Sequence, residues 1–252
     1  MDLQGASILI TGGRRVGGKL AVELAQRGAS VALTYRSSRD AIAATVAEVE
    51  RRGGRGLAIE ANLTHADEAA AAVDAAVTRF GRLDALINMA SVFQRTPFET
   101  LRPDHFDTLI ASNLAAPYHT AIAAARRMLN QPADDAGMHG KIVNIGDWAA
   151  DRPYRNYLPY LVAKGGLKTF TLALAAELAP RIAVNMIQPA MIEPPADLTA
   201  DEIAEVIAKT PLARVGRPED VNNLILYLLT GTDFVTGACF RVDGGRFLGC
   251  DD

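Results

Sequence analysis

A tyrosine and a lysine four residues apart are the first candidates for chemistry in this sequence. Tyr160 and Lys164 lie in a helical stretch, so they share one face of the helix. A free tyrosine has a pKa near ~10 and exchanges protons poorly at neutral pH, but a nearby ammonium favours the phenolate. The pair therefore indicates proton transfer. Because the spacing also arises by chance, the alternative is an ordinary surface pair.

A glycine-rich turn follows the first apolar run and precedes a helical stretch. Its residues are Thr11, Gly12, Gly13, Arg14, Arg15, Val16, Gly17 and Gly18. Glycines let the backbone turn tightly and approach a pyrophosphate, whose charge the N-terminus of the next helix favours. Such a turn alone can be structural, but its position after the first strand of a repeated βα pattern predicts dinucleotide binding.

The end of the second predicted strand indicates which dinucleotide binds. An Asp or Glu there would bond the adenosine ribose of NAD, whereas this chain has Arg36, Ser37 and Ser38. Arginine and hydroxyl groups suit a 2′-phosphate, and Arg14 or Arg15 adds positive charge nearby. We therefore expect NADP(H) as the cofactor. The alternative is that these arginines are ordinary surface charges.

Short apolar runs alternate with longer amphipathic stretches along the chain. The predicted strands are Ser7–Ile10, Val31–Tyr35, Gly56–Ile59, Leu83–Asn88, Lys141–Ile145, Ile182–Gln188 and Ala238–Val242. The predicted helices are Gly17–Arg27, Arg39–Arg52, His65–Phe80, Pro103–Leu129 with a bend at Pro117, Asn156–Leu178 and Pro218–Leu229. This alternation predicts a single α/β domain, 1–252, with a parallel sheet. Asn130–Gly140 is expected to be a surface loop. Gln188–Pro211, which contains four prolines, is expected to lack regular structure and to form a candidate substrate lid.

Composition excludes several classes of function. The 252 residues are 49% hydrophobic and 22% charged, and the net charge of −3 gives no general attraction to nucleic acid or to a membrane. The apolar runs are far shorter than the ~20 residues of a spanning helix. Cys239 and Cys250 cannot build a disulfide framework, and four histidines show no metal-site spacing, so no metal is expected. Without a basic segment after Met1, we expect a cytoplasmic protein.

Several motifs occur in the order typical of short-chain dehydrogenases/reductases. They are Thr11–Gly17, Asn88-Met89-Ala90, Asn113, the Tyr160/Lys164 pair, the run from Val184-Asn185 to Pro189, and Val242-Asp243-Gly244-Gly245. The chain resembles this family over essentially its full length. The resemblance implies a Rossmann-type, doubly wound parallel sheet of about seven strands, a homotetramer and a nicotinamide cofactor.

The same resemblance implies roles for individual residues. Tyr160 would donate the proton, Lys164 would lower its pKa and bind the cofactor ribose, and Asn113 would hold a relay water. The implied cofactor contacts are Gly12, Arg14, Arg15, Gly17, Arg36, Ser37, Ser38, Asn62, Asn88, Ala90, Lys164 and Pro189.

Departures from the family pattern point to a subgroup. Arg15 replaces the middle glycine of a turn that is one residue short, Met89 and Ser91 replace Asn and Gly, Asn62 replaces Asp, and Asp147 replaces the family's serine thirteen residues before Tyr160. Together with Ala90-Ser91-Val92-Phe93 and the run Ser112–Tyr118, these features resemble pteridine reductases and dihydromonapterin reductases. The resemblance implies NADPH-dependent reduction of a pteridine-like C=N bond, with Arg15, Ser91, Phe93, Asp147 and Tyr160 at the substrate.

The chemistry of a pterin agrees with these residues. Its flat ring would stack on Phe93, and its nitrogen-rich edge suits a carboxylate that accepts a hydrogen bond or, with a raised pKa, donates a proton. Ionised Asp147 would raise the pKa of Tyr160 and oppose Lys164, which favours a proton relay over a simple phenolate. The alternatives are that Asp147 caps a helix or loop and that Phe93 is a core aromatic.

Two other functions remain open. A carbonyl reductase, acting for example on 3-oxoacyl-carrier-protein or small ketones, lacks its usual serine here. A nucleotide-binding sensor or scaffold is favoured by the shortened turn and Met89, but the intact Tyr160, Lys164 and Asn113 oppose it. The predicted helices Pro103–Leu129 and Asn156–Leu178 carry more Ala and Leu than one core stripe needs, as expected of a self-associating protein. The tail Gly249–Asp252 offers no clear polar anchor for a neighbouring subunit's site.

Overall fold

The computed structural model describes residues 1–194 and 198–249. Pro195 of the predicted lid, and Cys250 with the rest of the tail, lie outside the described residues. The strands are β1 (Ser7–Thr11), β2 (Ser30–Tyr35), β3 (Arg55–Glu60), β4 (Ala85–Asn88), β5 (Gly140–Ile145), β6 (Ile182–Pro189) and β7 (Cys239–Val242). The α-helices are α1 (Val16–Gln26), α2 (Arg39–Arg51), α3 (Ala66–Phe80), α4 (Pro103–Ile110), α5 (Ala116–Leu129), α6 (Leu158–Leu178), α7 (Ala200–Ala208) and α8 (Pro218–Leu226).

The seven strands form one parallel sheet in the order β3-β2-β1-β4-β5-β6-β7. The predicted fold class is confirmed. The strand order reverses between β1 and β4, where Leu9 lies between Ala32 of β2 and Leu86 of β4. In doubly wound sheets, ligands bind beyond the carboxyl ends of the strands at such a reversal. The candidate residues are therefore expected at this edge.

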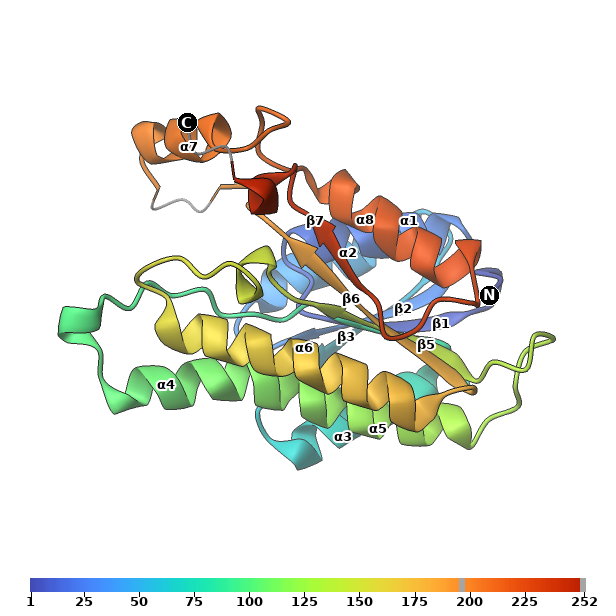
Figure 1. Ribbon diagram of the computed structural model, residues 1–252. Coiled ribbons are helices and arrows are strands. Elements are labelled where there is room, and N and C mark those ends of the chain that lie inside the picture. The colour runs from blue at the N-terminus through green and yellow to red at the C-terminus, as the bar shows by residue number, and fades with distance from the viewer. Residues whose placement is uncertain (195–197, 250–252) are drawn as a thin grey trace.

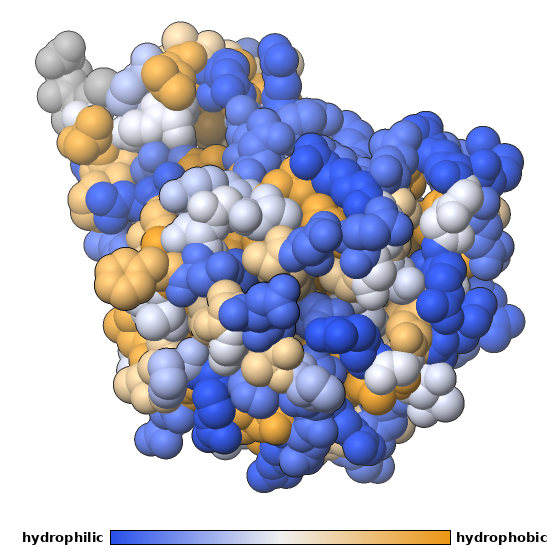
Figure 2. All heavy atoms as spheres, turned by 90° about the vertical axis from the view of Figure 1, so that its right-hand side faces the viewer, coloured by the Kyte–Doolittle hydropathy of each residue, from blue (hydrophilic) through white to orange (hydrophobic). Residues whose placement is uncertain are grey.

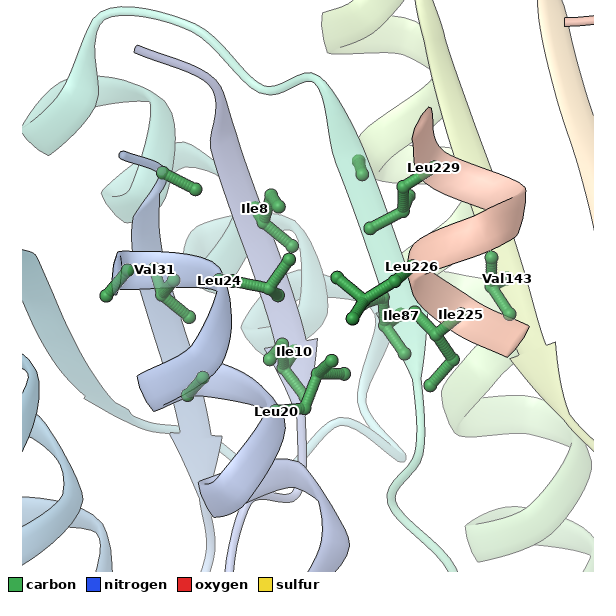
Figure 3. Close-up of a cluster of buried hydrophobic side chains, with 14 of the residues drawn as sticks. Ile8, Ile10, Leu20, Leu24, Val31, Ile87, Val143, Ile225, Leu226 and Leu229 are labelled. Atoms are coloured by element: carbon green, nitrogen blue, oxygen red, sulfur yellow. The ribbon is translucent and has the colours of Figure 1, made fainter. Parts of the chain in front are cut away.

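Helices cover both faces of the sheet, as Figure 1 shows. Helices α1, α2 and α8 lie on one face, and α3, α4, α5 and α6 lie on the other. Figure 3 shows the hydrophobic core between the sheet and the helices α1 and α8. There Leu20 and Leu24 of α1 and Ile225 of α8 pack against Ile10 and Ile87 of the sheet. All five side chains are fully buried. Because both faces are covered, successive residues of the central strands are apolar, as at 8–10 of β1 and 85–87 of β4.

Two of the predicted helices contain a π-helical turn in the structure. The predicted helix Pro103–Leu129 is divided into α4 and α5 by a π-helical turn, Ala111–Ala115. Pro117 has no N–H for the carbonyl of Asn113 and its ring crowds that carbonyl, so the backbone widens just before it. Helix α8 ends at Leu226 and continues as a second π turn, Tyr227–Gly231.

The expectation of no regular structure in Gln188–Pro211 is wrong for its second half. Helix α7 spans Ala200–Ala208. Thr199 and Glu202 form a reciprocal capping box, in which the Thr199 hydroxyl accepts from the Glu202 N–H and the Glu202 carboxylate accepts from the Thr199 N–H. The prolines stand on either side of this segment, so they bound the helix without interrupting it.

The edge at the amino ends of the strands faces the viewer in Figure 2. Hydrophilic side chains cover most of it, and apolar ones appear singly or in small groups. Among the described helices, none is long and apolar enough to cross a membrane. The side chains with candidate chemistry gather at the opposite edge of the sheet.

Candidate active site

The residues expected to transfer protons come from separate segments that meet at the carboxyl edge of the sheet. Asp147 follows β5, and Tyr160 and Lys164 lie in the first turns of α6. Asn113 lies in the π turn, and Phe93 lies in the segment after β4. The structure therefore brings together side chains that are up to 71 residues apart, from Phe93 to Lys164.

Asp147 and Tyr160 form the centre of the site. The Tyr160 hydroxyl donates to Asp147 Oδ2 at 2.8 Å. The other oxygen, Asp147 Oδ1, accepts from the Ala149 N–H at 2.8 Å and caps the short 3₁₀ turn Trp148–Ala150. Asp147 therefore caps a turn, as the alternative interpretation expected, and it also contacts the candidate proton donor; its contact with a substrate stays a prediction. The cap fixes the carboxylate so that Oδ2 faces Tyr160.

Burial controls the proton affinities of these two groups. Tyr160 is 5% exposed, and burial, followed by the charge of Asp147, raises the pKa of its hydroxyl well above the ordinary value. The neighbouring Ser91 hydroxyl acts to lower the pKa of Tyr160. Burial also raises the pKa of Asp147, although the Ala149 N–H, Tyr160 and Lys164 oppose the shift. The phenol is consequently held in its protonated, donating form.

Lys164 lies beside Tyr160 but does not contact its hydroxyl directly. Its Nζ is 5.8 Å from the centre of the Tyr160 ring and donates to the Ile145 carbonyl at 2.8 Å. Burial lowers the pKa of Lys164 to about 8, while Asp147 opposes that shift. The pKa of Tyr160 is raised by burial and by the charge of Asp147, which act against the lowering expected from Lys164.

Asn113 is fully buried and closes the far side of the site. Its Oδ1 accepts from the Ser91 hydroxyl at 2.6 Å, and its Nδ2 donates to the carbonyls of Val92 at 2.9 Å and Leu109 at 3.1 Å. These bonds tie the π turn to the segment after β4. Ser91 also lies next to Tyr160, but its single hydroxyl proton is donated to Asn113.

Phe93 is not a core residue. It is 48% exposed and stacks on Tyr157 with a centroid distance of 4.5 Å and an interplanar angle of 15°. Its edge contact with Tyr160 has a centroid distance of 5.0 Å. The Thr96 N–H donates to the Asn156 carbonyl at 2.7 Å, which fastens the Phe93 segment to the start of α6. An aromatic surface therefore adjoins the Tyr160 ring.

Sequence reasoning missed two members of this surface, Tyr154 and Tyr157. Tyr154 makes an edge contact with Tyr157 at 5.1 Å, and burial, followed by the charge of Asp147, raises its pKa. The signal was present, because Tyr154, Tyr157 and Tyr160 recur every three residues. The first two lie before α6 begins, so helical spacing did not reveal that they lie together.

The glycine turn has the close backbone packing that a pyrophosphate cradle requires. Gly12 has φ +68°, and a Cβ there would lie 2.9 Å from the Ala90 Cα. A Cβ on Gly17 would lie 2.8 Å from the Gly12 carbonyl oxygen. The Thr11 hydroxyl accepts from the Ala90 N–H at 3.2 Å, which holds β1 and β4 together at this point. Helix α1 starts directly after Arg15, so its N-terminus faces the turn.

The end of β2 carries positive charge. Arg36 and Ser37 are exposed and Ser38 precedes α2. The nearest carboxylate on the neighbouring strand, Glu60, is paired with Arg39 at 3.2 Å. Arg14 and Arg15, beside the glycine turn, are also exposed, so both segments present positively charged side chains to solvent.

The other residues expected to contact the cofactor are Asn62, Asn88 and Pro189, and each lies in a different environment. Asn62 Oδ1 accepts from the Thr64 hydroxyl at 2.9 Å, so this side chain shapes the turn before α3. Asn88 Nδ2 donates to Asn144 Oδ1 at 2.9 Å, while Asn88 Oδ1 is buried without a partner among the described residues. Pro189 ends β6 at the same edge of the sheet. An unpaired buried acceptor and a glycine cradle at one edge agree with a bound dinucleotide.

The C-terminal turn connects the candidate lid to the site. Arg246 donates to the Val206 carbonyl of α7 at 2.9 Å and lies over the Trp148 ring at 5.8 Å. Helix α7 is thereby joined to the 3₁₀ turn that Asp147 caps. Within residues 1–194 and 198–249, no group of His, Cys, Asp and Glu side chains is arranged to hold a metal ion.

Comparisons with known proteins agree with this geometry. Residues 13–246 match the family model described as enoyl-(acyl carrier protein) reductase. A 3-oxoacyl-(acyl-carrier-protein) reductase of Synechocystis is 34% identical over 245 residues, covering 95% of this chain and 96% of the relative. The short-chain reductase protein NovJ of Streptomyces niveus is 32% identical, covering 94% of this chain and 92% of the relative.

Solved structures superpose closely on this one. A short-chain dehydrogenase/reductase from Serratia marcescens has a TM-score of 0.89 and 32% identity, covering 98% of this chain and 100% of that chain. A blue fluorescent protein from a metagenomic library, solved in complex with NADPH, has a TM-score of 0.88 and 30% identity, covering 98% of this chain and 99% of that chain.

Proposed function

The chain belongs to the short-chain dehydrogenase/reductase family, whose members use a nicotinamide cofactor, and we propose that it is an NADPH-dependent reductase of a C=N bond in a pteridine-like ring. The carrying observation is the hydrogen bond from Tyr160 to Asp147 beside the half-exposed ring of Phe93. A carboxylate at this position suits a nitrogen-rich ring edge. An aromatic side chain suits its flat face.

The residues around the glycine turn fit the cofactor. The backbone from Gly12 to Gly17 and the N-terminus of α1 would hold the pyrophosphate, and Arg36 with Ser37 and Ser38 would hold the 2′-phosphate. Bound there, NADPH supplies the hydride. The solved relative in complex with NADPH supports this choice of cofactor.

Reduction of a ring C=N bond adds a hydride at carbon and a proton at nitrogen. The raised pKa of Tyr160 keeps its O–H intact at neutral pH, so this bond is available to break as the new N–H bond forms. Burial acts to raise the pKa of Asp147, and a carboxyl that carries a proton when the substrate is bound would return it to the phenolate across the same 2.8 Å contact. Lys164 stabilises the phenolate electrostatically in the meantime.

The test replaces Asp147 by serine and follows NADPH oxidation with dihydrobiopterin and with an acetoacetyl thioester in parallel. We expect Asp147→Ser to lower pterin reduction about 10²-fold, the usual scale for a positioned proton-transfer group. NADPH binding should remain nearly unchanged, because Asp147 contacts Tyr160 and not the glycine turn. Joint loss of cofactor binding and turnover would instead show that Asp147 mainly supports the fold.

A second candidate is reduction of a 3-oxoacyl thioester, which the names of the relatives favour. A protonated Asp147 would then hydrogen-bond the substrate carbonyl, the task that the family's serine performs. This candidate makes the opposite prediction: the unmodified protein prefers the acetoacetyl thioester, and Asp147→Ser leaves that reaction unchanged or improves it. The parallel assay separates the two functions directly.

Cofactor choice is tested by replacing Arg36 with Asp. The change removes a charge-assisted bond and places a carboxylate where the 2′-phosphate is proposed to lie, so we expect the NADPH dissociation constant to rise about tenfold or more. The affinity for NADH should rise or stay the same. Calorimetric titration measures both without a substrate. Arg126→Asp, on an exposed arginine of α5, is the matched control. Equal NADPH and NADH affinities in the unmodified protein would contradict the proposal.

We also propose self-association as a homotetramer. Helix α6 presents an outward stripe in which Leu158, Val162 and Leu172 are 54%, 47% and 43% exposed. Gly165, between them, has open space around its Cβ position. Leu172→Glu should therefore shift the sedimentation coefficient to a smaller species, whereas Leu212→Glu, on a 66% exposed leucine elsewhere, should not. A monomeric unmodified protein at micromolar concentration would refute this prediction.

A further inference from the structure

Gln188 is a buried amide that the proposed reaction does not use. It lies one residue before the end of β6, is 1% exposed, and neighbours Arg241 in the β6–β7 register. Its Nε2 donates to the Asp147 carbonyl and to Asp151 Oδ2, both at 3.3 Å. These two acceptors lie at the beginning and the end of the 3₁₀ turn Trp148–Ala150. One side chain is thus hydrogen-bonded to the residues on either side of this turn, Asp147 before it and Asp151 after it.

Asp151, the second acceptor of the Gln188 amide, is itself held by other side chains. Asp151 Oδ1 accepts from Lys168 Nζ of α6 at 2.5 Å, and Arg241 of β7 lies 4.0 Å from Oδ2. Although burial acts to raise it, the pKa of Asp151 is lowered, because Lys168, Gln188 and Arg241 favour the charged form. Asp151 therefore remains a carboxylate and keeps accepting from Gln188 at neutral pH. The turn is connected through it to both α6 and β7.

The amide orientation of Gln188 is determined by its surroundings. Exchanging Oε1 and Nε2 would set an oxygen against the Asp147 carbonyl and the Asp151 carboxylate. In the orientation observed, Oε1 is buried without a partner among the described residues. A buried amide with an unsatisfied acceptor stabilises the fold poorly. Its two donated bonds to the turn are what it contributes.

We propose that Gln188 is a positioning residue that sets the place of the Asp147 carboxylate relative to the Tyr160 hydroxyl. It acts through the 3₁₀ turn: its bond to the Asp147 carbonyl holds the backbone, and the cap from Ala149 holds the side chain. This inference rests on the proposed function for its kinetic consequences. The geometry of the turn is independent of the substrate.

Trp148 provides a readout that needs no substrate. It is the single tryptophan of the chain and lies inside the 3₁₀ turn. In Gln188→Leu, which keeps a similar volume and removes the amide, we expect increased acrylamide quenching and lower fluorescence anisotropy of Trp148. Gln131→Leu is the matched control, because Gln131 bonds to the backbone of Leu83 and His139 near the amino ends of the strands. It should leave both signals unchanged.

The kinetic test is a double-mutant cycle with Asp147→Ser. Gln188→Leu should lower kcat about tenfold in the unmodified background, leave KM for NADPH unchanged, and shift the pH profile of kcat. In the Asp147→Ser background the same change should have almost no effect, because the carboxylate that Gln188 positions is already absent.

The outcomes separate the inference from the proposed function. Equal losses of kcat in both backgrounds, or unchanged Trp148 signals in Gln188→Leu, would overturn the positioning role. Absence of turnover with every substrate, together with altered Trp148 signals, would contradict the proposed function but show that Gln188 holds the turn in place. A fall in thermal stability with Gln188→Leu and an unchanged pH profile would show a purely structural role.

Discussion

Tyr160→Phe is expected to abolish most of the reductase activity, with a loss of kcat of about 10³-fold or more, near the upper range for a positioned proton donor. The substitution removes one oxygen atom. That oxygen lies 2.8 Å from Asp147 and is placed beside Phe93, where the substrate ring is proposed to stack. Burial and Asp147 raise the pKa of Tyr160, so the phenol is protonated and is the available proton source.

The measurement is single-turnover NADPH oxidation with saturating substrate, accompanied by a titration of NADPH binding. Binding should change little, because the ring that remains keeps its packing against Phe93 and Lys164. Tyr118→Phe makes the same chemical change on an exposed tyrosine of α5 and should have no effect. Near-normal turnover in Tyr160→Phe would remove Tyr160 from the reaction.

The same site predicts a pH dependence in one direction. Burial lowers the pKa of Lys164 to about 8, so the cofactor-free protein loses this positive charge as the pH rises through that value. Without the ammonium, the phenolate formed by proton donation is no longer stabilised. We therefore expect kcat/KM, which reports the free enzyme, to fall above about pH 8. A profile that rises through this range would contradict the role of Lys164.

Lys141→Met is expected to lower the free energy of unfolding by about 3 kcal/mol, the upper end of the cost of leaving buried hydrogen-bonding groups unsatisfied. Lys141 is 3% exposed at the start of β5. Its Nζ donates to the carbonyls of Leu228 at 3.1 Å, Leu229 at 2.9 Å and Thr232 at 2.7 Å, and lies 2.6 Å from Asp233. Methionine occupies the space of the lysine methylene groups but has no side-chain N–H to donate, so these carbonyls are left unsatisfied.

Urea unfolding at a fixed protein concentration measures the effect. The control is Lys19→Met, because Lys19 is 56% exposed and its contacts with Glu193 and Glu219 are surface ion pairs. Such pairs contribute about 0–1 kcal/mol. Equal stability losses in the two variants would show that the buried lysine is not required to close the π turn Tyr227–Gly231.

The order of the elements could be predicted from the sequence, because periodicity and breakers are local properties. Apolar runs such as Ser7–Ile10 indicated strands buried on both faces, and the spacing of Tyr160 and Lys164 placed both on one helix face. The glycine turn was also readable, since tight backbone approaches at Gly12 and Gly17 require residues without a Cβ. These features depend on neighbours a few residues away.

Helix α7 shows where counting breakers fails. The prolines of Gln188–Pro211 suggested irregular structure throughout, yet none stands between Thr199 and Lys209. The capping box of Thr199 and Glu202 was the stronger local signal, because it satisfies two donors at the helix start. The prediction was wrong because it averaged over the segment instead of locating each proline.

Only the tertiary structure decided the chemistry of Asp147. The sequence shows that this position is an aspartate and not a serine. Whether its carboxylate caps a turn or contacts Tyr160 depends on how β5 and α6 pack, and in the structure it does both. The raised pKa of Tyr160 and the lowered pKa of Lys164 have the same origin, since burial is a property of the packed site. Gln188 likewise contacts Asp147 and Asp151 because β6 pairs with β5 in the sheet. Contacts of this kind, between segments distant in the sequence, depend on the packing of the whole chain.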